Sequence, residues 1–155
     1  MKHLLVCFAV LLCLTTIFAH TSRAQNSELK IGTVNNSNYA YLDGAGCYFK
    51  SPSASKNSES YIFLAEIGRE PNRMWINVDG RVTTLKFVSS TWKDNQRLKK
   101  GSRYTETYRS GDVTARITYV VTKMGEIESA DYAATIVVTK GNRSKTVKAV
   151  GECGA

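Results

Sequence analysis

From Leu29 onward, apolar and polar residues alternate in short runs rich in β-branched and aromatic side chains. Alternation with a period of two predicts strands that bury one face and expose the other. The pattern is clearest after Asp112, where every second residue is apolar: Val113, Ala115, Ile117, Tyr119 and Val121. No segment shows the sustained helical period with capping residues that predicts a helix. The chain is therefore expected to be all-β.

The alternation predicts nine strands, at residues 30–34, 47–50, 61–67, 73–78, 82–88, 103–109, 113–123, 132–140 and 145–150. Asp79-Gly80 and Gly141-Asn142 each lie between two of these segments and are typical of two-residue hairpin turns. Residues 43–46 are expected to form the turn before Cys47. These features predict an antiparallel meander that closes as a small barrel. A β-sandwich is the alternative, because strand spacing does not separate the two architectures.

The first residues have the pattern of an export signal. Lys2 and His3 precede an apolar run over residues 4–14, and Ser22 and Ala24 supply the small side chains that a cleavage site needs. We therefore predict a signal peptide at 1–24 and a single β-rich domain at 25–155. The apolar run is shorter than the roughly 20 residues that span a bilayer. We expect no membrane span after processing and a secreted or periplasmic location.

Processing after Ala24 would leave two cysteines, Cys47 and Cys153. Two cysteines near opposite ends of an exported domain predict one structural disulfide. A reactive thiol pair or a metal site is the alternative. Neither is supported by a nearby histidine or by a Cys-x-x-Cys spacing.

Charge and histidine content restrict the chemistry. The formal net charge is +8, and it becomes +6 when Lys2 and Arg23 are removed with the signal. The same cleavage removes both histidines, His3 and His20, so catalytic sites that use a histidine base or a histidine zinc ligand are excluded. We expect a non-enzymatic protein with no cofactor and no metal.

An acidic segment over residues 126–131 has three interpretations. It is best matched by a solvated turn between two strands, because its spacing does not follow a calcium-binding loop. A weak calcium site and a pair of catalytic carboxylates for glycoside cleavage are the other two.

A basic segment interleaved with aromatic residues is the most marked candidate contact surface. Basic side chains beside aromatic rings suit a polyanion, although a charge run is also the ordinary composition of a solvated loop. We expect a monomer that contacts an anionic cell-envelope polymer or another protein, with no specific nucleic-acid partner. The candidate contact residues are Trp92, Lys99, Lys100, Gly101, Arg103, Tyr104 and Arg109.

A family resemblance rests on the order of several short motifs: Val78-Asp79-Gly80-Arg81, Leu85, Gly101-Ser102-Arg103-Tyr104, Gly111 and Ala115. In this order they resemble the periplasmic and membrane-bound inhibitors of C-type lysozyme. The resemblance implies a small exported β-barrel with a disulfide and, as an alternative function, inhibition of an envelope-attacking enzyme. Lys100 stands where the family has a serine, and Ser110 stands where it has a lysine. As a whole the chain is similar to small exported bacterial proteins without an assigned function.

Overall fold

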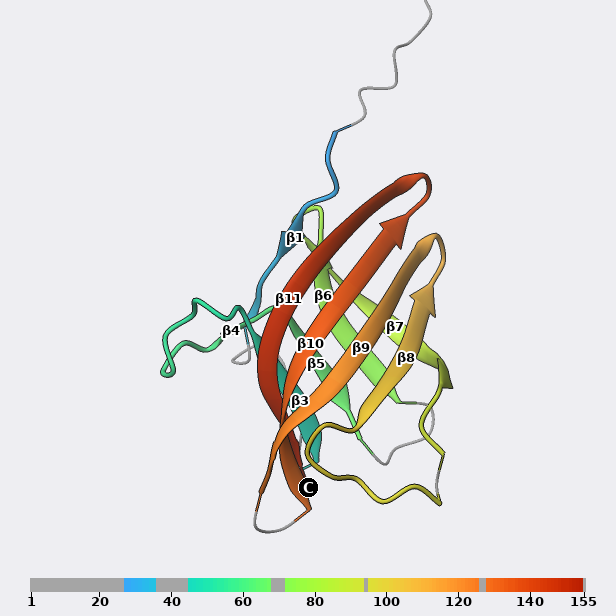
Figure 1. Ribbon diagram of the computed structural model, residues 1–155. Coiled ribbons are helices and arrows are strands. Elements are labelled where there is room, and N and C mark those ends of the chain that lie inside the picture. Colours follow the sequence, from blue (N-terminus) through green and yellow to red (C-terminus); the bar gives the residue numbers. More distant parts are fainter. Residues whose placement is uncertain (1–26, 36–44, 68–71, 94, 126–127, 155) are drawn as a thin grey trace, which may run out of the picture.

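The computed structural model describes residues 27–35, 45–67, 72–93, 95–125 and 128–154 (Figure 1). The predicted signal peptide lies outside these residues. The described residues form strands connected by turns, and no helix among them is long and apolar enough to cross a membrane. The strands are β1 (Ile31–Gly32), β2 (Val34–Asn35), β3 (Gly46–Lys50), β4 (Ser60–Tyr61), β5 (Phe63–Glu66), β6 (Arg73–Val78), β7 (Arg81–Ser90), β8 (Arg103–Ser110), β9 (Val113–Met124), β10 (Ser129–Lys140) and β11 (Arg143–Gly154).

Eight of these strands form a closed antiparallel barrel. Around it, β3, β5, β6, β7, β8, β9, β10 and β11 follow one another as they do in the sequence, and β11 returns to pair with β3. This is an up-and-down barrel, in which closure leaves no free sheet edge. The predicted meander and its closure as a barrel are confirmed, and the sandwich alternative is wrong.

Three short strands, β1, β2 and β4, lie beside the eight strands of the barrel. β1 pairs with Asn77 and Val78 of β6, next to the residues of β6 that pair with β5. β2 and β4 pair with each other in a separate two-stranded sheet. β2 and β4 contribute to a small outer hydrophobic cluster, which is formed by Val34, Leu64 and Trp75 with Tyr48, Tyr61 and Val82 packed against it. Ile31 of β1 packs against the main core instead.

All nine predicted strand segments form strands, with differences at their ends. Residues 30–34 divide into β1 and β2, and the last strand continues beyond Val150 to Gly154. The end of this strand is glycine-rich because it passes very close to β3. A Cβ atom on Gly151 would lie 2.0 Å from the carbonyl oxygen of Tyr48 and 2.9 Å from the ring of Phe49. Glycine is therefore needed there, within a strand.

Two of the hairpin turns were predicted correctly. Asp79 and Gly80 have φ angles of 54° and 84°, as a type I′ turn requires, and they join β6 to β7. Gly141, with a φ of 57°, begins the turn between β10 and β11. Residues 43 and 44 of the third predicted turn lie outside the described residues.

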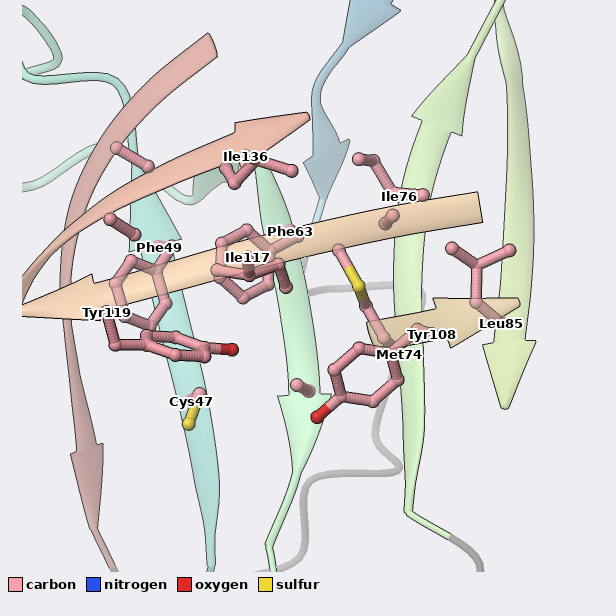
Figure 2. Close-up of a cluster of buried hydrophobic side chains, with 14 of the residues drawn as sticks. Cys47, Phe49, Phe63, Met74, Ile76, Leu85, Tyr108, Ile117, Tyr119 and Ile136 are labelled. Carbon is pink, nitrogen blue, oxygen red and sulfur yellow. The ribbon is translucent and has the colours of Figure 1, made fainter. Parts of the chain in front are cut away.

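The core fills the interior of the barrel with side chains from alternate positions of each wall strand (Figure 2). The five apolar residues predicted to share one face of β9 are all buried, which confirms the alternation. Phe49 and Phe63 stack with ring centroids 4.5 Å apart. The largest fully buried side chains also include Met74, Ile76, Leu85, Tyr108, Ile117, Tyr119 and Ile136.

The predicted disulfide is confirmed. Cys47 of β3 and Cys153 of β11 lie directly opposite each other, with Cα atoms 4.1 Å apart, and are bonded. Because 106 residues separate the two cysteines, the bond closes almost the whole domain into one loop. It lies on the seam where the barrel closes.

An ion-pair network holds the other end of the barrel together. Asp79, in the β6–β7 turn, accepts hydrogen bonds from Arg143 at 2.7 Å, Lys140 at 3.1 Å and the backbone N–H of Lys30 at 3.2 Å. Lys145 also pairs with Glu28. These contacts tie the segment before β1 to the turns of two hairpins.

Replacing Cys47 and Cys153 together by alanine should lower the free energy of unfolding by about 2 to 5 kcal/mol, because the unfolded chain regains the entropy of a long open loop. Urea unfolding of the variant and of the wild type, each with and without reductant, measures the effect. Reductant should weaken the wild type and leave the variant unchanged. Equal midpoints for the oxidised wild type and the variant would contradict the assignment.

Acid should weaken the ion-pair network at Asp79. The hydrogen bonds from Arg143, Lys30 and Lys140 hold the pKa of Asp79 well below its ordinary value. Since the folded-state pKa is the lower one, this contribution is present above the unfolded-state pKa and is lost as pH falls below about 4.

We therefore expect Asp79→Asn to be less stable than the wild type at neutral pH and to lose less further stability between about pH 5 and pH 2. Asparagine tolerates the positive φ, so the turn itself is preserved. Urea unfolding across this range measures the effect, with Asp112→Asn, at the exposed β8–β9 turn, as the matched control. Parallel pH profiles for the wild type and Asp79→Asn would rule out the proposed contribution.

Candidate ligand cavity

A cavity of about 720 Å³ lies at the end of the barrel opposite the Asp79 network. Its walls come from the ends of the strands and from the connection between β7 and β8, which curls around this end in Figure 1. The volume falls within the range of about 300 to 1,000 Å³ that is usual for small-molecule sites. An eight-stranded barrel is just wide enough either to be filled by its own side chains or to hold one small ligand.

Small side chains on neighbouring strands explain why this end is not filled. In the strand register, Ala65 of β5 lies opposite Cys47, Cys47 opposite Cys153, and Cys153 opposite Ala130 of β10. All four side chains are buried, and they follow one another across four adjacent strands. Cys47, Cys153 and Ala130 line the cavity, and their small volume leaves space in front of this part of the wall. The disulfide itself is part of the cavity lining.

Aromatic rings also line the cavity. The Trp92 and Tyr104 ring centroids are 5.4 Å apart, and those of Tyr104 and Tyr132 are 6.1 Å apart. Tyr119 packs behind them, stacked on Tyr104 at 4.8 Å. Leu98 adds an aliphatic side chain from the β7–β8 connection. The cavity thus has a preformed surface to which four aromatic side chains contribute: Trp92, Tyr104, Tyr108 and Tyr132.

One carboxyl group points inward among these rings. Alternation along β8 directs Tyr104, Glu106 and Tyr108 toward the interior, and all three line the cavity. The hydroxyl of Tyr108 donates a hydrogen bond of 2.8 Å to Glu106 Oε2. Burial raises the pKa of Glu106, and the hydrogen bond from Tyr108 partly opposes that shift. No lysine or arginine among the described residues forms an ion pair with this carboxyl group.

The buried tyrosines supply neutral hydroxyl groups. Burial raises the pKa values of Tyr104, Tyr108, Tyr119 and Tyr132 above the ordinary value, so all four stay protonated at physiological pH. Figure 2 shows the hydroxyls of Tyr108 and Tyr119 pointing toward the space between their two rings. The hydroxyl of Tyr119 also lowers the pKa of Glu106, but its geometry completes no hydrogen bond, and it is buried without a partner among the described residues. A buried hydroxyl group without a hydrogen-bond partner would be stabilised by a polar group of a bound ligand.

A second carboxylate at the rim is already neutralised. Glu66 is only 4 % exposed, and its two oxygens accept hydrogen bonds from Arg73 at 2.6 Å and 3.0 Å. The guanidinium of Arg73 lies over the ring of Trp75, on the outside of the barrel. This bidentate pair occupies Glu66, so Glu106 is the inward carboxyl group without a cationic partner.

The structure separates the contact residues predicted from the sequence. Trp92 and Tyr104 line the cavity, and Cys47 and Cys153 lie beside them. The other predicted contact residues are exposed and do not line it: Lys99, Lys100, Gly101, Arg103 and Arg109. Arg109 is six residues from Arg103 along β8, which is about 20 Å at the rise of a strand.

Sequence reasoning missed Glu106, Tyr132 and Leu98. For Glu106 a signal was present, because a glutamate two residues from tyrosines on either side shares their face of a strand. The acidic segment lies only partly within the described residues. Among all the residues that the structure describes, no group of three or more His, Cys, Asp or Glu side chains is arranged to hold a metal ion.

Comparison with family models, with curated proteins and with solved structures finds no match for this chain. Its class is therefore defined by the fold and the cavity alone. It is an eight-stranded up-and-down β-barrel, closed by a disulfide, with a ligand-sized aromatic cavity at one end.

Removing the hydroxyl of Tyr108 should raise the pKa of Glu106 further, since the hydrogen bond that opposes the effect of burial is lost. A pH titration of the glutamate side-chain carboxyl signals by ¹³C NMR in Tyr108→Phe measures this shift. Tyr61→Phe, which removes a hydroxyl from the outer cluster, is the control and should leave Glu106 unchanged. An unchanged or lower pKa in Tyr108→Phe would contradict the interaction.

Proposed function

We propose that this chain is an exported, non-enzymatic binding protein that holds a small molecule in the open end of its barrel. The observation that carries the proposal is the preformed cavity, which has ligand-like volume and an aromatic lining. Ligand sites are typically concave and mostly apolar, with a few convergent polar groups. The polar side chains that line this cavity include Glu106, Tyr108 and Tyr132.

The β7–β8 connection supports the proposal because it contributes to the cavity from outside the barrel wall. Trp92 and Leu98 of this connection line the cavity, while Lys93 and Arg97 beside them are exposed. Backbone hydrogen bonds hold the connection in place, from Gln96 to Lys93 and from Gly101 to Val121. The two apolar side chains are therefore part of a structured wall.

An anionic cell-envelope polymer remains a second candidate partner. Its support is the exposure of Lys99, Lys100 and Arg103, which lie on the outside of the barrel end. Exposed cations in this arrangement favour non-specific contact with a polyanion. That contact would use a surface separate from the cavity.

Lysozyme inhibition is supported less well by the geometry. The motif residues Gly101 and Gly111 lie beyond opposite ends of β8, whose eight residues span about 25 Å. A single narrow cleft would have to reach both ends of the barrel to contact both motifs. The family resemblance stays a prediction about fold and descent, and the cavity is the stronger basis for a function.

Binding of N-phenyl-1-naphthylamine, a neutral dye whose fluorescence rises in apolar surroundings, tests the proposed function. The wild type should bind the dye, and Trp92→Ala should bind it about tenfold more weakly because a large aromatic contact is lost. Trp75→Phe is the matched control, since Trp75 lies in the outer cluster. Absence of binding to the wild type, or equal weakening by both substitutions, would refute the proposal.

A further inference from the structure

The charge inside the cavity is opposite to the charge of the whole chain. The chain is rich in lysine and arginine, yet none of the lysine and arginine residues that the structure describes lines the cavity. The charged side chains among the described residues that do line it are carboxyl groups: Glu66, Glu106 and Glu128. Arg73 neutralises Glu66, and Glu128 is exposed, which leaves Glu106 as the inward carboxyl group available to a ligand.

The groups around Glu106 suit a positive ligand. The faces of aromatic rings attract cations, and the attraction is greatest where water is excluded. Trp92, Tyr104 and Tyr132 supply such rings beside the carboxyl group. A half-buried carboxylate is stabilised by a cationic partner, and no lysine or arginine among the described residues supplies one to Glu106, so an arriving cation would take that place. Among the residues that the structure describes, no basic group lines the cavity to hold an anionic ligand.

From this arrangement we infer that the ligand is a small organic cation, an amine with an apolar portion, whose ammonium group is held by Glu106 among the rings of Trp92, Tyr104 and Tyr132. The inference rests on the proposed function and adds the chemical class of the ligand. The apolar portion of the ligand would lie against Leu98, Met124 and the Cys47–Cys153 disulfide. The unpartnered hydroxyl of Tyr119 lies on the same side of the cavity, next to Glu106.

The positive charge of the chain does not prevent this binding. Lys99, Lys100 and Arg103 are exposed to solvent, where salt at physiological concentration screens charges beyond about 8 Å. Charges within the cavity are screened much less. The local carboxyl group therefore has more influence on a bound ligand than the distant lysines.

Binding should also depend on pH. Burial raises the pKa of Glu106, so the empty protein keeps a proton there at higher pH than an ordinary glutamate does, and that proton must leave when the ammonium group binds. The facing tyrosines stay neutral, Glu66 is paired with Arg73, and Glu128 is exposed at the mouth. Affinity for an amine should thus rise with pH as Glu106 ionises, at pH values above the ordinary titration range of a glutamate.

Three ligands of equal length and different charge test the inference by isothermal titration calorimetry. These are 4-phenylbutylamine, 4-phenylbutan-1-ol and 4-phenylbutyrate. We expect the amine to bind at least about tenfold more tightly than the alcohol, and the carboxylate to bind more weakly than both. Glu106→Gln should abolish the advantage of the amine and its pH dependence while retaining alcohol binding. Glu152→Gln, which changes an exposed carboxylate on the outer face of β11, should behave as the wild type.

Three other outcomes would each refute a different part of the proposal. If the alcohol binds as well as the amine, the cationic ligand class is refuted while the proposed binding function stands. If the amine is preferred equally by the wild type and Glu106→Gln, the assignment to Glu106 is refuted. If none of the three compounds binds and the neutral dye also fails to bind, both the inference and the proposed function are refuted. Retained alcohol binding by Glu106→Gln shows that the variant is folded.

Discussion

The pairing of β3 with β11 is the contact on which the rest of the structure depends. Without it the sheet would have two free edges and no enclosed interior. Five residue pairs form this seam, and one of them carries the Cys47–Cys153 disulfide. Gly151 permits the close approach of the two backbones, because any side chain there would collide with Tyr48 and Phe49. The seam therefore combines backbone hydrogen bonds, a covalent bond and a steric requirement for glycine.

Because the barrel is closed, successive side chains of each strand point alternately into the interior and toward the outside. Through most of the barrel the inward residues are large and apolar, such as Phe63, Ile117 and Ile136, and they fill the interior (Figure 2). Toward the end of the seam the inward residues become small, with Ala65 and Ala130 flanking the disulfide. The cavity is thus a consequence of the same seam that closes the barrel. The residues that make closure possible are too small to fill the space beside them.

Much of the fold could be predicted from local sequence, whereas the cavity could not. Alternation along residues 113–121, the Asp79-Gly80 turn and the lone pair of cysteines each have a local physical cause, and the structure confirms all three. The cavity depends on strand register, which brings Ala65, Cys47, Cys153 and Ala130 to one level although they lie far apart in the sequence. Export, by contrast, was predicted from residues that lie outside the described part of the chain.

The basic and aromatic segment illustrates why composition alone gave an incomplete site. In the sequence, Trp92 and Tyr104 appear to share one surface with Lys99 and Lys100, which suggests a single polyanion contact. The fold turns the rings toward the cavity and leaves the lysines in solvent. The β7–β8 connection therefore borders two different surfaces. Its exterior is basic, and the cavity on its inner side contains aromatic rings and a carboxyl group. Because they do not share side chains, an anionic partner on the outside and a cationic ligand inside would not compete for the same groups.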